Sequence, residues 1–204
     1  MENYHKNLDL LEKNYVYSKE MEHDACGVGA IVSTEGKKSR IVVEHGIEAL
    51  KAVWHRGAVD ADGKTGDGAG IHLEIPKDFF IEKIEVTGHI YDKSEICVGM
   101  IFLPRNDYSA QESCKTIVES ELTKNDFSIY GWRQVPVNPK ILGEKAFQTM
   151  PEIMQVLFKS NDKNLLDKEL ERKIYETRKK IENKAFQLSL NNFYICSISS
   201  KSII

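Results

Sequence analysis

The stretch MEHDACGVGAIVS, residues 21–33, places a cysteine directly before a Gly-Val-Gly turn and a short apolar run. Two interpretations of Cys26 are open at this point. It is either a small buried hydrophobe entering a strand or a thiol nucleophile on a glycine-lined turn that a substrate can approach. A thiol attacks a carbonyl as its thiolate, so a catalytic Cys26 needs a neighbouring base or a lowered pKa. Histidine is the usual base, and no spacing in the chain links a histidine to Cys26.

A second way to activate the thiol uses the α-amino group of an N-terminal residue, whose pKa is about 8, as the base. Cys26 can use it only if the chain is cleaved between Ala25 and Cys26. Residues 1–25 are polar and have no clear apolar period, which favours a leader over a part of the core. The sequence therefore predicts a propeptide over 1–25 and one domain over 26–204.

The composition is that of an ordinary globular domain, with 204 residues, 41% hydrophobic and 29% charged. A net charge of −3 with scattered bases predicts no nucleic-acid and no membrane partner. The four cysteines form no CxxC pair and have no metal-ligand spacing with histidine, which argues against disulfides and zinc. No apolar run approaches the ~20 residues of a membrane span and no secretory signal is visible, so we expect a cytoplasmic protein.

The remaining pattern alternates between strands and helices. Strands are expected over 27–32, 70–75, 96–104, 127–137, 151–159 and 192–200. Helices are expected from residue 40 to just before Gly57, from residue 76, over about 107–124, and over about 166–185. The segment 58–70, rich in glycine and aspartate, must be a loop that approaches a ligand or another backbone. Together these elements predict an α+β fold in which helices cover an antiparallel-rich sheet.

Three segments resemble the start of the large subunit of the glutamate synthase family: DACGVGAIV (24–32), GIEALKAVWHRGAVDADGKTGDGAGIHLEIPKDFF (46–80) and YGWRQVPVNPKILG (130–143). That start is a class II glutamine amidotransferase domain, and the similarity runs from about residue 21 to Ile204. It implies an αββα sandwich of the N-terminal-nucleophile hydrolase class. In that class Cys26, freed by propeptide removal, attacks the side-chain amide of L-glutamine. Ammonia leaves, and water hydrolyses the resulting thioester.

The resemblance also implies a role for Arg56, which occupies the arginine position of the family's His-Arg-Gly segment beside the nucleophile. A guanidinium can bind a carboxylate through its rigid fork of donors, so Arg56 is the predicted substrate-binding residue. The alternative for Arg56 is a cation at the C-terminal end of a helix, facing the macrodipole. Cys97, Cys114 and Cys196 lie in apolar settings typical of strands and helices, and we expect them to be structural.

The chain departs from the family's pattern in its substrate-binding and oxyanion motifs. The family's domain carries an Arg-Phe segment, a His-Asn-Gly-Glu segment that forms the oxyanion hole, and a later aspartate. No Asn-Gly and no Arg-Phe dipeptide occurs in these 204 residues. We therefore expect the front half of a glutaminase domain that is inactive by itself. The alternative is a non-catalytic binding or assembly module that keeps part of the fold.

The resemblance has further consequences for cofactors, partners and packing. The family's FMN and iron–sulfur cluster belong to its other domains, so no cofactor is assigned to these 204 residues. The implied partners are L-glutamine and a second chain carrying the rest of the synthase. The final residues, SSKSII, are expected to begin a strand that pairs with the preceding FYICSIS strand, leaving an exposed sheet edge.

Overall fold

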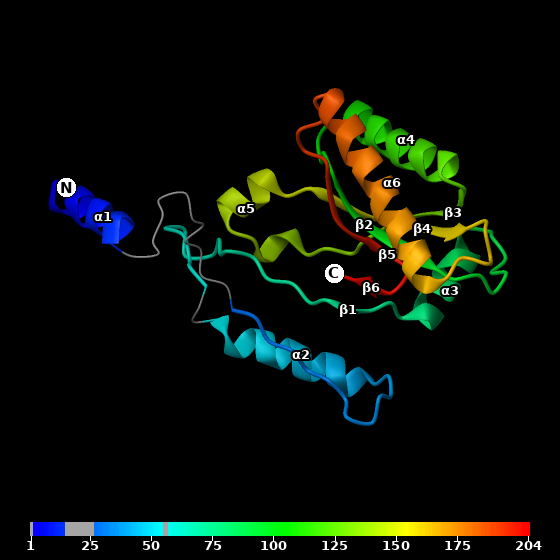
Figure 1. Cartoon of the computed structure of the whole chain (residues 1–204), viewed down its shortest axis with the longest axis horizontal. Helices are drawn as coiled ribbons and strands as arrows, with labels where there is room; N and C mark the ends of the chain where they lie inside the picture. Colours follow the sequence, from blue (N-terminus) through cyan, green and yellow to red (C-terminus); the bar gives the residue numbers. More distant parts are fainter. Residues whose placement is uncertain (1, 15–26, 55–56) are drawn as a thin grey trace.

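The computed structural model describes residues 2–14, 27–54 and 57–204 (Figure 1). The helices are α1 (Glu2–Asn14), α2 (Arg40–Ala52), α3 (Lys77–Val86), α4 (Tyr108–Lys124), α5 (Glu144–Thr149) and α6 (Asp167–Gln187), with a short 3₁₀ turn η2 (Pro139–Ile141). The strands are β1 (Leu73–Glu74), β2 (Cys97–Leu103), β3 (Phe127–Gln134), β4 (Glu152–Ser160), β5 (Tyr194–Ser199) and β6 (Ser202–Ile203). Within the described ranges, none of the helices is long and apolar enough to cross a membrane.

The centre of the fold is a four-stranded antiparallel sheet in the order β3-β4-β2-β5. Strand β2 is buried almost throughout, which explains why CVGMIFL is apolar at consecutive positions rather than alternating. Helices α4 and α6 lie side by side across one face of the sheet (Figure 1). Between helices and sheet lies a closed apolar core, in which the rings of Phe127 and Phe158 meet edge to face at 5.3 Å.

The opposite face of the sheet carries a second, smaller core. Tyr130 and Leu157 project into it from the sheet, Ile84 from α3 and Ile203 from β6. Strand β6 pairs antiparallel with β1, so this two-stranded sheet and α3 form the next layer. In the view of Figure 1, β1 runs between β6 and α2. The layers confirm the predicted α+β class.

The sequence of helix α6 explains both how the helix packs on the sheet and where it begins. Leu170, Ile174 and Ile181 are buried at steps of four and seven, so one stripe of the helix faces the sheet. The carboxylate of Glu169 accepts a hydrogen bond from the main-chain nitrogen of Leu166 at 3.1 Å, which satisfies one free donor at the helix start. The predicted helix over 166–185 is confirmed, as are the helix over 107–124 and the four long strands.

Three expectations were wrong or incomplete. Residues 27–32 form no strand, since the segment pairs with no described strand and leaves Val28 90% and Val32 81% exposed. The strand expected over 70–75 shortens to the two residues of β1. The segment that follows β5 forms its strand pairing with β1 and not with β5, and its apolar Ile203 is buried in the second core. Helix α1 was not expected, and it stands apart from the sheet in Figure 1.

Candidate functional site

Both predicted site residues, Cys26 and Arg56, lie outside the described residues, as does most of the junction between the predicted propeptide and the domain. The structure does place the chain directly after each of them. Residues 27–33 run without regular structure after Cys26, and Gly57 with Ala58 begin the loop after Arg56. The described part of the candidate site therefore consists of the segments next to these two positions.

Helix α2 leads toward Arg56 and is shorter than the sequence indicates. Ser39 caps its first turn by accepting a hydrogen bond from the main-chain nitrogen of Ile41. The helix ends at Ala52, and the basic residue in its last turn is Lys51. Lys51 is thus the described cation that faces the negative end of this helix dipole.

The loop after Arg56 closes on itself through main-chain and carboxylate bonds. The Ala58 nitrogen donates to Asp67 Oδ2 at 2.7 Å, which joins the two ends of the loop. The Asp60 nitrogen donates to the Thr65 carbonyl oxygen at 2.8 Å. The HRGAVDADGKTGDG motif therefore contains a loop of defined shape.

Asp62 organises the tip of this loop. Its Oδ1 accepts from the main-chain nitrogens of Lys64 at 2.9 Å and Thr65 at 2.7 Å. Its Oδ2 accepts from the Thr65 hydroxyl at 2.6 Å and from the Glu144 nitrogen, at the start of α5, at 3.1 Å. The Thr65 hydroxyl, followed by these main-chain donors, lowers the pKa of Asp62 to about 2. A single carboxylate thus shapes the loop and ties it to another part of the chain.

Gly143 makes this approach possible. A Cβ at position 143 would overlap the Thr65 hydroxyl and the Asp62 carboxylate, so only glycine fits here. Next to it, Lys145 Nζ lies 2.5 Å from Asp60 Oδ2. We call this contact the loop–α5 joint, defined as Asp60, Asp62, Thr65, Gly143, Glu144 and Lys145. The expectation that segment 58–70 approaches another backbone is confirmed.

The three described cysteines have no reactive character. Cys97 and Cys114 are fully buried in the sheet's helix-side core. Burial raises the pKa of the Cys114 thiol to about 11 and that of Cys97 well above the ordinary range. Cys196 is half-buried, and burial again raises its pKa. The burial of Cys97 and Cys114 in the core agrees with their predicted structural role, because a thiol that stays protonated is a poor nucleophile.

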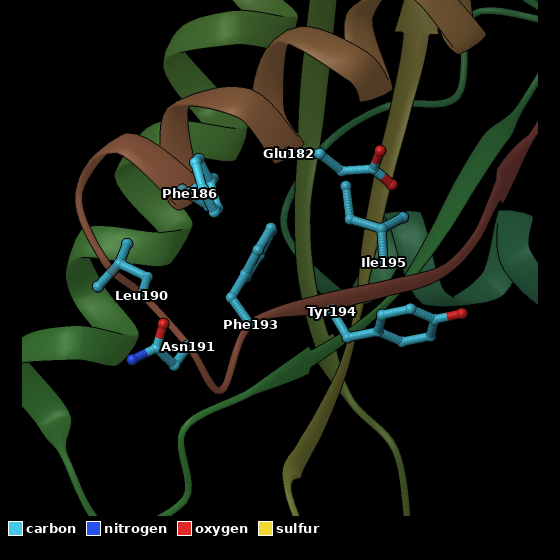
Figure 2. A pocket seen from close by; sticks show the side chains of 8 residues that line it. Glu182, Phe186, Leu190, Asn191, Phe193, Tyr194 and Ile195 are labelled. Atoms are coloured by element: carbon cyan, nitrogen blue, oxygen red, sulfur yellow. The ribbon is translucent and has the colours of Figure 1, made fainter.

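A hollow of about 330 Å³ lies where α6 ends and β5 begins (Figure 2). It is lined by Glu182, Ala185, Phe186, Leu190, Asn191, Phe193, Tyr194 and Ile195. Its walls are mainly apolar. In the described ranges, no three His, Cys, Asp or Glu side chains converge as metal ligands would.

The residues of the loop–α5 joint lie in or next to the motifs that resemble the family, but the sequence alone predicted no individual role for any of them. The signal for Asp62 and Asp67 is present locally, since aspartate followed by glycine is typical of turns that bond their own backbone. Gly143 carries no such signal, because the need for glycine arises from a contact with residues about 80 positions earlier.

Comparison with known proteins identifies the family. The family model for class II glutamine amidotransferases matches residues 26–204. The glutamate synthase [NADPH] large chain of Azospirillum brasilense is 51% identical over 201 residues, covering 98% of this chain. The ferredoxin-dependent glutamate synthases of Arabidopsis thaliana (number 1, chloroplastic/mitochondrial) and Spinacia oleracea are 40% and 36% identical, each over 90% of this chain.

The chain spans only 13% of the Azospirillum brasilense protein and 11% of each of these two plant proteins. The family model, in contrast, covers the whole chain from Cys26 onward. With an α+β fold behind that match, the chain belongs to the class II glutamine amidotransferases, which are N-terminal-nucleophile hydrolases.

Proposed function

We propose that this chain is the glutaminase portion of a glutamate synthase, in which Cys26 releases ammonia from L-glutamine. The observation that carries the proposal is the family match, which begins at Cys26 itself. The loop–α5 joint supports it, since it links two segments whose sequences resemble the family, HRGAVDADGKTGDG and YGWRQVPVNPKILG. L-Glutamine is the proposed substrate, and the ammonia serves glutamate synthesis.

The proposed reaction starts with removal of residues 1–25. The freed α-amino group of Cys26 takes the thiol proton, and the thiolate attacks the side-chain carbonyl carbon of glutamine. The carbon–nitrogen bond then breaks, the ammonium group returns the proton to the leaving nitrogen, and ammonia departs from a glutamyl thioester. Water hydrolyses this thioester to glutamate and restores the thiol. Arg56 binds the substrate through its guanidinium.

A polypeptide of these 204 residues alone is proposed to show no measurable turnover. The family's oxyanion hole uses an Asn-Gly pair, and the printed sequence contains none. Loss of one oxyanion donor typically costs roughly 3–4 kcal/mol of transition-state stabilisation, and here both are missing. A second polypeptide carrying the Arg-Phe and His-Asn-Gly-Glu segments would supply them. The family's flavin and iron–sulfur cluster belong with other domains of the synthase, and the proposed location is the cytoplasm.

The first experiment is the intact mass and N-terminal sequence of the purified chain. A species that begins at Cys26 supports maturation, and a chain that retains residues 1–25 leaves Cys26 without its amine base.

Ammonia release from L-glutamine is then measured with and without a second polypeptide that carries the missing segments. We expect release only with that polypeptide, and none from the matched Cys26→Ser chain. Release that survives Cys26→Ser would overturn the proposal. No release under any condition would favour the alternative, a non-catalytic binding or assembly module.

A further inference from the structure

Strand β5 forms one open edge of the central sheet. The described strands of this sheet follow the order β3-β4-β2-β5, so within the described ranges β5 pairs with a neighbour of the sheet only on its β2 side. An open edge presents main-chain N–H and C=O groups with which a strand of another molecule can pair. Such pairing joins copies of a protein to one another, and folded proteins commonly carry features that prevent it.

The beginning of β5 lies beside apolar side chains that reach solvent. Phe186, Leu188 and Tyr194 are all more than half exposed. The hollow of Figure 2 lies at the same place, between the end of α6 and the first residues of the strand. An exposed edge with apolar surroundings is a predicted site of association. A feature that closes the edge is therefore needed most at the first half of β5.

The main chain of β5 is irregular at this point. Between the paired residues Ile195 and Ser197, Cys196 has no partner on β2, so the strand has a β-bulge there. A bulge increases the local twist and disrupts the regular ladder, which is one way in which natural proteins close an edge.

Arg178 of α6 reaches the strand immediately before this bulge. Its Nη2 donates to the carbonyl oxygen of Ile195 at 2.7 Å. Its Nε donates to Oε1 of Glu182, about one turn further along the same helix, at 2.6 Å. The guanidinium is therefore held between a carboxylate and the strand, and the Arg178 side chain is only 26% exposed. Because hydrogen bonds from a charged donor are stronger than neutral ones, an approaching strand would have to displace a firmly held group.

The other edge strand, β3, has a similar arrangement. Tyr130 is the extra residue of a bulge between Ile129 and Gly131. The hydroxyl of Thr87, which follows α3, lies 3.0 Å from the carbonyl oxygen of Tyr130. On both edges of the sheet, a side chain from a helix or its end thus contacts the main chain at a bulge.

We propose that Arg178, held by Glu182, closes the open edge of β5 and keeps two copies of this chain from pairing strand to strand. The guanidinium occupies the carbonyl oxygen of Ile195, which the β5 strand of a second copy would otherwise bind. This role is separate from the proposed glutaminase reaction, and it depends on neither Cys26 nor Arg56.

The test compares two arginines of α6 in the full 204-residue chain. Arg172 forms the same kind of pair as Arg178, with Glu176 at 2.9 Å, but its side chain is 81% exposed. Arg178→Met removes the donors and keeps an apolar stem, and Arg172→Met is the matched control. Sedimentation velocity over a range of concentrations measures the fraction of dimer, and circular dichroism checks that each variant is folded.

The two variants should differ in how readily they associate. Arg178→Met should form dimers at a concentration about ten-fold lower than the unchanged chain, as expected for the loss of one hydrogen bond from a charged group. Arg172→Met should behave as the unchanged chain does. An Arg178→Met chain that associates no more readily than the unchanged chain would overturn the proposal.

Cys196 reports which surfaces meet in the dimer. It is half-buried in the middle of β5, whereas Cys97 and Cys114 are fully buried. Antiparallel pairing of two β5 strands about a two-fold axis brings the same central residue of each strand close to the axis. Mild oxidation of Arg178→Met should therefore trap a disulfide between the two copies of Cys196, which peptide mass spectrometry identifies. Association without this link would show that another surface is used, and the proposal would be wrong.

Glu182→Gln is a second variant that leaves Arg178 in place. It removes the charge that holds the guanidinium, so it should promote the same association, with the same Cys196 link, to a smaller extent than Arg178→Met. If Arg178→Met fails to fold, this variant decides. A Glu182→Gln chain that stays as monomeric as the unchanged chain would then contradict the proposed role of Arg178.

Discussion

The region from 27 to 70 and the region from 71 to 204 are held together by different forces. Every described residue that is buried belongs to the second region, where two apolar cores lie on the two faces of one sheet. The first region contains no buried residue among those described. Its position is set by hydrogen bonds to carboxylates, by the contact at Gly143 and by ion pairs. We therefore expect stability to reside in the sheet, whereas the loop over 57–70 is placed by polar contacts that are largely exposed to solvent.

The largest effect should come from a core change in the second region. Phe158 is fully buried and packs edge to face on Phe127, so Phe158→Ala should lower the free energy of unfolding by about 3–5 kcal/mol. Urea denaturation followed by circular dichroism measures this. The control is Val32→Ala in the first region, where an 81% exposed side chain should change the value by less than about 0.5 kcal/mol. Equal losses of unfolding free energy for the two variants would contradict the difference in stability between the two regions.

An acid titration should report directly on the loop–α5 joint through Asp62. The bonds from Thr65 lower the pKa of Asp62 from 3.8 to about 2 in the folded chain. Because the folded pKa is the lower one, the contribution of this carboxylate is complete above pH 3.8 and is lost as the pH falls through about 2. The amide resonance of Thr65 should titrate with a midpoint near that lower value, and Asp62→Asn should abolish the titration. A midpoint close to 3.8 would show that the joint is not formed in solution.

The smallest effect should come from an ion pair that joins the two regions. Lys38 Nζ lies 2.7 Å from Glu74 Oε1, with side chains 65% and 61% exposed. Exposed pairs contribute little in water, so Lys38→Ala should change the free energy of unfolding by less than about 0.5 kcal/mol. Adding 1 M salt to the unchanged protein should mimic the substitution, since salt screens this pair. A loss above 1 kcal/mol would mean that this contact, rather than the joint, secures the first region.

The sequence predicted best those elements whose pattern is set by one buried face. The stripe of α6 and the apolar run of β2 are local signals, and both were placed to within a few residues. The apolar run at 27–32 was misread because a strand also needs a partner, which no local pattern supplies. Strand β6 was assigned the wrong neighbour for the same reason, since its pairing with β1 depends on residues far along the chain.

The residues of the candidate site also differ in how far the sequence alone could predict them. Cys26 and Arg56 were predicted from motifs, and both lie outside the described residues, so their roles stay predictions. The loop that contains Asp62 and Asp67 was expected as a loop, because glycine and aspartate have strong turn preferences. Its attachment at Gly143 could not be predicted, because a steric limit imposed by a distant segment leaves no trace in neighbouring residues.

The pairing of β1 with β6 has a consequence for the order of folding. It joins Leu73 to Ile203, so nearly all of the second region lies inside the loop that this pairing closes. The entropic cost of closing a loop rises with the length of the loop. Contacts between residues this far apart in the sequence therefore form late, unless other structure has already brought them together. The pairs β3–β4 and β2–β5 should therefore precede it. We therefore expect the β1–β6 pairing to form in a late kinetic step, once the central sheet has brought the two strands together.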